Sequence, residues 1–418
     1  MSDAELVIDS IAAGGDGVAR SNGVVVFVPR TAPGDRVRVA LDTRKRFARG
    51  RLTDLLVPSS DRVEPLCYHY RVDRCGGCQL QHMRYDAQVD AKRSIVRDSL
   101  SRIGKRTVNP PEIVNSQQQW RYRRKLTLAM RRRAGSRDDW VIGLHPLDDP
   151  VGVFQLADCP ITDERVVNVW RDVMEARALF PDADELRASV RLLDDGSAIV
   201  MEGGNAWPQR SAFFARVESA SALWWRPAHR PRMLVAERYR EERRGHGAVA
   251  SASFAQVNPD VARLLHDYVV DRVHARRPRT VIDAYAGTGA TAVPIAERGA
   301  RLVAIEADAD AAARCGSLLP AGSRAIADRV ENVLGELLPA DVVIVNPPRV
   351  GLHERVSALL EAASPAPGAI VYVSCDPATL GRDLARMPRY RIESLRAFDM
   401  FPQTAHVETV CELVPSDA

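Results

Sequence analysis

The sequence has no apolar run near the ~18 residues that a membrane-spanning helix needs. Residues 1–9 are acidic and polar and do not resemble a secretory signal. The 7 cysteines are an odd number, which argues against a disulfide framework and favours metal binding or catalysis. These absences predict a cytoplasmic protein without a membrane partner, and we expect it to be a monomer.

Lysine is also scarce: four of the 58 basic residues are Lys, and the rest are Arg. The formal net charge of +4 is unevenly distributed. Residues 1–140 hold 27 Lys and Arg against 16 Asp and Glu, whereas residues 141–418 hold 31 against 38. A basic first part attracts a polyanion such as nucleic acid. The 418 residues suffice for two or three domains, and 46% hydrophobic residues are typical of a globular protein.

Residues 1–58 show the pattern of short β-strands. Val24–Val28 predicts a strand and Pro33-Gly34-Asp35 a turn. Over residues 36–41, Arg36, Arg38 and Ala40 alternate with Val37, Val39 and Leu41, which is the period of a strand. Basic residues follow at Arg44, Lys45, Arg46, Arg49 and Arg51. We expect a small β-barrel that binds RNA, although any β domain with a charged outer face fits the same pattern.

Residues 59–250 form the predicted central α+β domain. Strands are expected over 189–201, around an Asp194-Asp195-Gly196 turn, and residues 237–247 predict a charged loop. A second basic block makes this domain a candidate RNA-binding surface. Its candidate phosphate contacts are Arg121, Arg123, Arg124, Arg131, Arg132 and Arg133.

Residues 251–418 alternate between apolar strands and helices. Strands are expected at 280–283, 302–306, 341–346 and Ala369–Ser374, with helices at 287–298 and Ala309–Leu318. Such alternation predicts a parallel sheet covered by helices, which is a Rossmann-like α/β domain.

The turn after the first of these strands carries a cofactor signature. It reads Asp283-Ala-Tyr285-Ala-Gly287-Thr-Gly, and Glu306 ends the next strand. Both carboxylates are expected at the carboxyl edge of the sheet, where a carboxylate can hold ribose hydroxyls. The third glycine of a dinucleotide-binding loop is missing. The loop therefore favours S-adenosylmethionine, while an ordinary turn of an NAD domain remains open.

Three further segments place reactive groups near that edge. Asn346-Pro-Pro-Arg349 ends one strand and predicts a rigid lip. Cys375 closes another strand, and Glu408 lies near the C-terminus. Methylation of uracil at C5 needs a thiolate that adds to C6, a methyl donor, and a base that removes the C5 proton. Cys375 and Glu408 fit the first and last of these roles.

Four cysteines form a second set, Cys67-x7-Cys75-x2-Cys78 and the distant Cys159-Pro160. Four thiolates can bind zinc or a cubane 4Fe-4S cluster. A zinc ribbon normally has two C-x2-C knuckles, and only one is present here, so the spacing favours iron–sulfur without excluding zinc.

Taken together, these motifs resemble the bacterial RNA 5-methyluridine (uracil-C5) methyltransferase family, of the iron–sulfur type that acts on 23S rRNA. Residues 13–28 with the Pro33 turn resemble its TRAM RNA-binding barrel, and residues 75–82 (CGGCQLQH) resemble its iron–sulfur segment. Residues 120–125 and 254–258 are similar to its central basic motif and to the entry of its catalytic domain.

The resemblance implies three domains: 1–58 a TRAM barrel, 59–250 a central domain with the cluster, and 251–418 a Rossmann-like catalytic domain. It implies Cys375 as nucleophile, Glu408 as base, and a 4Fe-4S cluster as well as S-adenosylmethionine as cofactors. The implied cofactor-binding residues are Gln256, Asp283, Tyr285, Gly287, Glu306 and Asn346. The family usually has Asp in place of Asn346, and the Cys67–Cys75 spacing is slightly wide.

Several alternatives stay open at this stage. The RNA could be tRNA, with uridine 54 as the target. Asn-Pro-Pro is also typical of amino-group N-methyltransferases, but there an aromatic residue follows instead of Arg349. A cytosine-C5 methyltransferase normally uses two cysteines at different strand ends. Asn346 also fits an RNA-binding protein whose catalytic site has decayed.

Overall fold

In the computed structural model, the described residues are 2–43, 46–133, 135, 138–193, 196–238 and 256–416. Contacts divide the chain into two compact units. Unit 1 comprises Met1–Glu64, His82–Gln117 and Asp260–Ala418, and unit 2 comprises Pro65–Gln81 and Gln118–Pro259. No helix within these described ranges is long and apolar enough to cross a membrane.

The N-terminal part of unit 1 is a six-stranded sheet in the order β1-β5-β6-β4-β3-β2. Alternate residues of its strands point inward, and Leu6, Val26 and Val39 are among the side chains of its small buried core. The strand predicted at Val24–Val28 is confirmed as β4. The strands are β1 (Ser2–Val7), β2 (Ser10–Ile11), β3 (Gly17–Ser21), β4 (Val24–Val28), β5 (Arg36–Thr43) and β6 (Ala48–Val57).

The C-terminal part of unit 1 contains an eight-stranded sheet in the order β17-β16-β15-β18-β19-β21-β20-β7. β17, β16, β15, β18 and β19 run parallel, whereas β21 is antiparallel to both β19 and β20. The expected Rossmann-like α/β sheet is therefore confirmed. The strands are β7 (Glu112–Val114), β15 (Thr280–Ala284), β16 (Arg301–Glu306), β17 (Arg324–Ala327), β18 (Val342–Val345), β19 (Ala369–Ser374), β20 (Tyr390–Phe398) and β21 (Glu408–Pro415).

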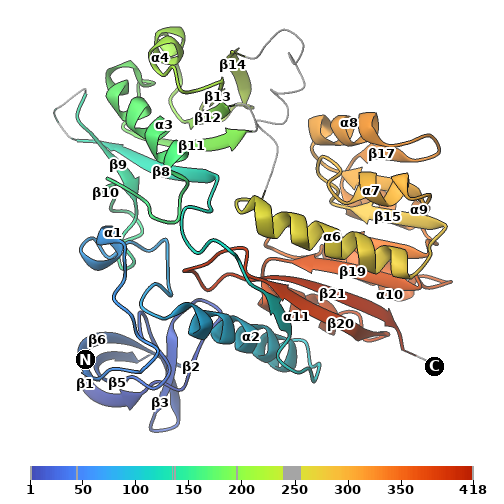
Figure 1. Cartoon of the computed structure of the whole chain (residues 1–418), viewed down its shortest axis with the longest axis horizontal. Coiled ribbons are helices and arrows are strands. Elements are labelled where there is room, and N and C mark those ends of the chain that lie inside the picture. The colour runs from blue at the N-terminus through green and yellow to red at the C-terminus, as the bar shows by residue number, and fades with distance from the viewer. Residues whose placement is uncertain are drawn as a thin grey trace. The chain divides into compact units, whose positions relative to one another are not determined.

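Helices cover both faces of this sheet (Figure 1). One apolar core joins the sheet to α6, α7 and α8, and the other joins it to α2, α9, α10 and α11. The strands are nearly continuous apolar runs because both of their faces are buried. The helices are α2 (Tyr85–Arg102), α6 (Pro259–Ala275), α7 (Ala292–Glu297), α8 (Ala309–Leu318), α9 (Val330–Leu337), α10 (Glu354–Ala362) and α11 (Pro377–Ala385).

Unit 2 is built on a seven-stranded sheet in the order β10-β9-β8-β11-β12-β13-β14. α3 and α4 pack on this sheet through a core that includes Trp170, Trp207 and Phe213. The elements are α1 (Tyr68–Arg71), β8 (Lys125–Arg132), β9 (Trp140–Leu144), β10 (Phe154–Gln155), α3 (Glu164–Glu175), η1 (Arg177–Leu179), β11 (Glu185–Leu193), β12 (Gly196–Glu202), α4 (Arg210–Arg216), β13 (Ala222–Arg226) and β14 (Met233–Glu237).

Some details differ from the sequence-based expectations. The helix expected over 287–298 is shorter, because Gly287 and Gly289 have positive φ values of 57° and 95° and the helix begins at Ala292. Residues 82–117 join unit 1, although the predicted domain 59–250 contains them. The three-domain division stays a prediction. Arg44, Lys45, Asp194, Asp195 and most of the loop at 237–247 lie outside the described residues.

Candidate active site

Most of the predicted site residues lie in order along the carboxyl edge of the eight-stranded sheet. Glu306 ends β16, Asp283 is the second-to-last residue of β15, and Asn346 follows β18. Cys375 follows β19, and Glu408 begins the neighbouring antiparallel strand β21. Chain order reverses between β15 and β18, and ligands of open α/β sheets bind at such a switch point.

The loop after β15 is shaped to receive a ligand. Tyr285 and Gly287 adopt left-handed backbone conformations, with φ of 67° and 57°. A Cβ at Gly287 would meet no atom within 4 Å, so the backbone there is open to a ligand. A Cβ at Gly289 would instead lie 3.0 Å from the Cys315 Sγ, which explains why glycine occupies that position.

The two carboxylates of the loop are held differently. Glu306 accepts hydrogen bonds from the Gly287 backbone N–H at 2.9 Å and the Asp308 N–H at 2.8 Å. These bonds fix its orientation and leave lone pairs for two hydroxyl groups. Asp283 is buried and accepts a hydrogen bond from the Thr291 hydroxyl at 2.7 Å. Burial raises the pKa of Asp283 to about 7, and the charge of Glu306 adds to that rise.

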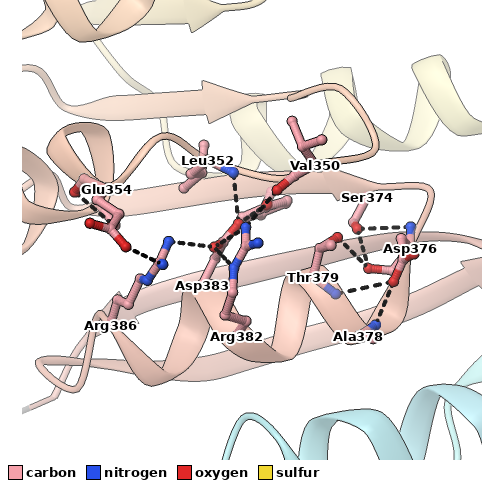
Figure 2. A network of polar contacts seen from close by, with 12 residues as sticks. Val350, Leu352, Glu354, Ser374, Asp376, Ala378, Thr379, Arg382, Asp383 and Arg386 are labelled. Atoms are coloured by element: carbon pink, nitrogen blue, oxygen red, sulfur yellow. Dashed lines mark hydrogen bonds and ion pairs between the residues drawn. The ribbon is translucent and has the colours of Figure 1, made fainter.

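Cys375 lies in a tight turn between β19 and α11. The Asp376 side chain caps α11 by accepting from the N–H groups of Ala378 and Thr379, at 2.8 and 3.1 Å. The Ser374 hydroxyl donates to the Asp376 carbonyl oxygen at 2.9 Å, which closes the turn on the other side of Cys375. Figure 2 shows these bonds around the start of the helix. The backbone at Cys375 is therefore fixed by its two neighbours.

Cys375 and Glu408 lie just beyond the end of the ladder between the neighbouring strands β19 and β21. β19 and β21 pair in an antiparallel register that ends at Ser374 and Thr409, so the next residues in each direction are Cys375 and Glu408. Burial raises the pKa of the Cys375 thiol to about 11, and the negative charge of Glu408 adds to the rise. Burial also raises the pKa of Glu408 to about 7. A carboxylate with a pKa near neutrality is suited to act as a general base.

Arg349 is a functional candidate that the sequence reasoning missed. Its positive charge lowers the pKa of both the Cys375 thiol and the Glu408 carboxyl group, against the stronger effect of burial. It therefore favours the charged forms of both groups. Its position in the Asn346-Pro-Pro-Arg349 string was the available signal, but we used the residue there only to argue against an aromatic lip.

The loop that carries Asn346 and Arg349 is held by Asp383 of α11 (Figure 2). Asp383 has no exposed surface and accepts hydrogen bonds from the Leu352 N–H at 2.7 Å and the Tyr372 hydroxyl at 2.8 Å. The Arg382 guanidinium contacts Asp383 at 2.8 Å and donates to the Val350 carbonyl oxygen at 2.7 Å. The lip and the Cys375 turn are thus fixed to the same helix.

The four predicted cluster cysteines gather in unit 2. Cys67, Cys75 and Cys78 are buried, and Cys159 packs against the apolar cluster that contains Cys67 and Cys78. None of the four is part of a disulfide. Burial raises the pKa of the Cys78 thiol, and the charges of Cys159, Cys75 and Cys67 add to that rise. Among the described residues, no three His, Cys, Asp or Glu side chains are grouped so as to hold a single metal ion. A cubane cluster contains four irons, so its ligands stand farther apart than those of one ion.

His69 fixes the segments that carry these cysteines. Its Nε2 accepts a hydrogen bond from the Ala157 N–H at 3.0 Å, so Nδ1 carries the proton toward Asp73 at 2.7 Å. Its ring stacks on Phe154 with a centroid distance of 5.1 Å. These contacts connect helix α1, which follows Cys67, to the strand that precedes Cys159.

Several predicted phosphate contacts have acidic partners in the structure. Arg121 binds Asp158 through both terminal nitrogens, at 2.9 and 2.8 Å, and also donates to the Cys159 carbonyl oxygen. It therefore supports the segment that contains Cys159. Ion pairs also connect Arg131 to Glu185, Arg132 to Asp182 and Arg133 to Asp139. A role in RNA binding stays a prediction for all of these arginines.

A different group of cations surrounds Lys125. Lys125 is the Cα partner of Arg191 across β8 and β11, and Arg123 donates to the Lys125 carbonyl oxygen at 2.8 Å. Burial lowers the pKa of Lys125, and the charges of Arg191, Arg123 and Arg187 lower it further. Such a concentration of positive charge is complementary to a phosphate backbone. Lys125 belongs to the basic motif at residues 120–125, but nothing in the sequence indicated that it pairs with Arg191.

Gln256 belongs to unit 2, and Phe254 and Ala255 of the same motif lie outside the described residues. Its contact with a cofactor stays a prediction.

Comparisons with known proteins identify the family of this chain. Residues 322–414 match the tRNA (Uracil-5-)-methyltransferase family, and residues 5–53 match the TRAM domain. The 23S rRNA (uracil(1939)-C(5))-methyltransferase of Thiobacillus denitrificans is 31% identical over 95% of this chain and 96% of its own length. An RNA methyltransferase of Halalkalibacterium halodurans is 30% identical over 98% of this chain and 96% of its own length.

A solved structure supports the fold. The tRNA (uracil-54, C5)-methyltransferase of Pyrococcus abyssi, in complex with S-adenosyl-L-homocysteine, superimposes with a TM-score of 0.69. The match covers 98% of this chain and 100% of that one, at 23% identity. The chain belongs to the RNA (uracil-C5) methyltransferase family with an N-terminal TRAM domain. The resemblance to this family drawn from the sequence motifs is therefore confirmed, while the iron–sulfur type stays a prediction.

Proposed function

We propose that this protein transfers a methyl group from S-adenosylmethionine to C5 of a uridine in 23S rRNA. The observation that supports the proposal is the register of β19 and β21, which ends at Ser374 and Thr409, so that Cys375 and Glu408 are the next residues of the two neighbouring strands. The reaction needs this pair of groups on one substrate ring, the thiol as nucleophile and the carboxylate as base.

Cys375 and Glu408 act in different steps of the proposed reaction. The Cys375 thiolate forms a bond to C6 of the uracil, and the electrons of the C5–C6 double bond move toward the ring carbonyl, which makes C5 nucleophilic. C5 then accepts the methyl group. Glu408 removes the remaining proton from C5, the C5–C6 double bond forms again, and the C6–S bond breaks to return the thiolate. Arg349 favours the charged forms of both protein groups.

S-adenosylmethionine would supply the methyl group as an electrophilic sulfonium. The observed cradle fits such a ligand: Gly287 leaves open space, and Glu306 is oriented to accept hydrogen bonds from ribose hydroxyls. Asp283, Tyr285 and Asn346 lie on or beside the same loop edge, since the Asn346 N–H donates to the Ala284 carbonyl oxygen at 3.3 Å. We assign cofactor contacts to these residues and to Gln256.

The choice of 23S rRNA over tRNA rests on the relative from Thiobacillus denitrificans, which is named for that substrate and is 31% identical. The likeness to the tRNA-modifying enzyme, at 23% identity, supports the fold alone. The match to the TRAM domain and the positive charges around Lys125 support RNA binding, because an RNA backbone is negatively charged. The target uridine must leave its stack to reach the half-buried Cys375 thiol, which favours a loop or single strand.

We further assign a 4Fe-4S cluster to Cys67, Cys75, Cys78 and Cys159. The Cys78 thiol interacts with the other three cysteines, and three of the four are buried, which fits this group. The methyl transfer consumes no electrons, so the cluster would serve to hold these segments of unit 2 together.

A trapping experiment tests the reaction. RNA that contains 5-fluorouridine should form a covalent complex with the enzyme in the presence of S-adenosylmethionine, because fluorine cannot leave C5 as a proton. Cys375→Ala should abolish the complex. If the native enzyme forms none, the uracil-C5 reaction is wrong, and an amino-group methyltransferase or an inactive RNA-binding protein becomes the better account. Parallel assays with 23S rRNA and tRNA transcripts decide the substrate.

A further inference from the structure

Two polar residues are buried on one face of α2. Gln88 and Lys92 are four residues apart, which places them one helical turn apart on the same side. Gln88 is 1% exposed and Lys92 has no exposed surface. A lysine is costly to bury unless its charge is paired, and this chain has very few lysines to place. An apolar residue would fill the same space, so the retained charge calls for an explanation.

Lys92 binds the start of the loop at residues 399–407, which connects β20 to β21. Its Nζ donates to the Asp399 Oδ1 at 2.5 Å and to the Phe401 carbonyl oxygen at 3.0 Å. Asp399 is also fully buried, so the ion pair is shielded from water and salt. One ammonium group thus holds two points of the loop.

Gln88 binds the middle of the same loop. Its Oε1 accepts from the Gln403 backbone N–H at 2.9 Å, and its Nε2 donates to the Gln403 Oε1 at 3.0 Å. Gln403 has a φ of 71°, a left-handed conformation that is costly for a residue other than glycine. The paired hydrogen bonds from Gln88 compensate for that conformation.

The loop ends directly at the base. Glu408 is the first residue of β21 and is the Cα partner of Phe398, the last residue of β20. The loop therefore leaves the sheet at Phe398 and returns to it at Glu408. Thr404 and Ala405 are buried as well, so the loop is packed along much of its length. A shift of the loop would be transmitted to the point where the strand starts.

We propose that Gln88 and Lys92 are positioning residues that hold the 399–407 loop and thereby fix the Glu408 carboxylate at the C5 proton of the bound uracil. The inference rests on the proposed uracil-C5 reaction and deepens it. The helix that positions the base lies far from it in sequence, between the TRAM domain and β7. Neither residue touches the substrate in this account, because both act through the loop.

The proposal predicts which step fails. Glu408 acts after methyl transfer, when it takes the C5 proton and the C6–S bond breaks. In a Lys92→Met enzyme, methyl transfer should remain near the native rate, while release of methylated RNA slows by about 10- to 100-fold, as expected for a small displacement of a catalytic group. Labelled methyl groups should then accumulate in a covalent enzyme–RNA complex on ordinary uridine RNA, visible on a denaturing gel in a single-turnover assay.

A matched control separates position from stability. Arg276→Met breaks an ion pair between a half-buried arginine and a buried carboxylate, that of Arg276 Nε with Glu412 Oε1 at 2.6 Å. Glu412 is on β21, the strand that Glu408 begins, but lies away from the loop. It should lose thermal stability without accumulating the complex. If Lys92→Met does not fold, Lys92→Met/Asp399→Leu removes both charges, which buried pairs often tolerate, and Gln88→Leu tests the second anchor.

The outcomes are distinguishable. The proposal is overturned if the folded loop variants release RNA at the native rate, or if they slow methyl transfer and release equally, as a general loss of structure would. The native enzyme with 5-fluorouridine RNA serves as the reference. A failure to trap that complex would reject the uracil-C5 reaction itself, and this inference with it.

Discussion

The Thr409 hydroxyl donates a hydrogen bond to the Ser374 carbonyl oxygen at 3.2 Å, at the end of the ladder between β19 and β21. The residues just beyond this pair are Cys375 and Glu408. One hydrogen bond therefore closes the ladder next to the proposed nucleophile and the proposed base. A sheet register is a rigid way to set the distance between two groups, because a slip of one residue would turn one of them to the opposite face.

Replacing Glu408, the proposed base, should separate methyl transfer from removal of the C5 proton. In Glu408→Gln, the thiol can still add to C6 and C5 can still accept the methyl group, but the C5 proton has no acceptor. We expect turnover to fall by about 10²- to 10⁴-fold, with the methylated complex trapped on ordinary uridine RNA. A gel assay with labelled methyl groups measures it. Free 5-methyluridine at the native rate would exclude Glu408 as the base.

The same carboxylate should affect stability with pH. Its pKa is raised by burial from 4.5 to about 7 in the folded protein, so the folded state holds a proton that the unfolded state releases. This contribution is complete below pH 4.5 and is lost as pH rises through about 7. Glu408→Gln should therefore gain stability relative to the native protein between pH 5 and pH 8, by at most about 3 kcal/mol. Denaturant titrations at both pH values measure the difference. An equal difference at both would contradict the assigned burial.

Removing the Asp383 carboxylate should cost more folding free energy than removing any one of its hydrogen bonds. Asp383→Ala removes the acceptor for Leu352, Tyr372 and Arg382, and should cost about 3–5 kcal/mol of folding free energy, as loss of a buried charged partner does. Tyr372→Phe removes one bond and should cost about 1 kcal/mol. Denaturant unfolding compares the two variants. The KM for RNA should also rise in Asp383→Ala, since the lip with Asn346 and Arg349 loses its anchor; equal losses in both variants would refute the role of Asp383.

If the four cysteines hold the proposed 4Fe-4S cluster, replacing one of them should selectively lower the iron content of the protein. Cys159→Ala should reduce bound iron and destabilise unit 2, because the proposed cluster would connect Cys159 to the segment with Cys75 and Cys78. Iron analysis of anaerobically purified protein measures this. Cys315→Ala changes a buried cysteine of unit 1 and should retain full iron. Full iron content in the Cys159 variant would show that this cysteine is not a ligand.

The cations around Lys125 predict a salt-dependent loss of RNA affinity. Lys125→Glu should weaken binding of all RNA sequences and reduce the slope of log affinity against log salt by about 1. Binding titrations over a range of salt concentrations measure it. Arg324→Glu makes a similar change of charge on the exposed start of β17 and is the control. Unchanged affinity in the Lys125 variant would mean that this group of cations faces no phosphate.

The sequence by itself determined the local parts of the site. The glycines and carboxylates after β15, the proline lip and the strand before Cys375 could all be predicted, because each is encoded by residues that are neighbours in the chain. Only the tertiary structure placed Cys375 opposite Glu408, joined α2 to the catalytic unit, and brought Asp383 to the lip and Lys92 to the loop before the base. Those relationships depend on strand register and on the packing of distant segments, and no local pattern of side chains specifies either.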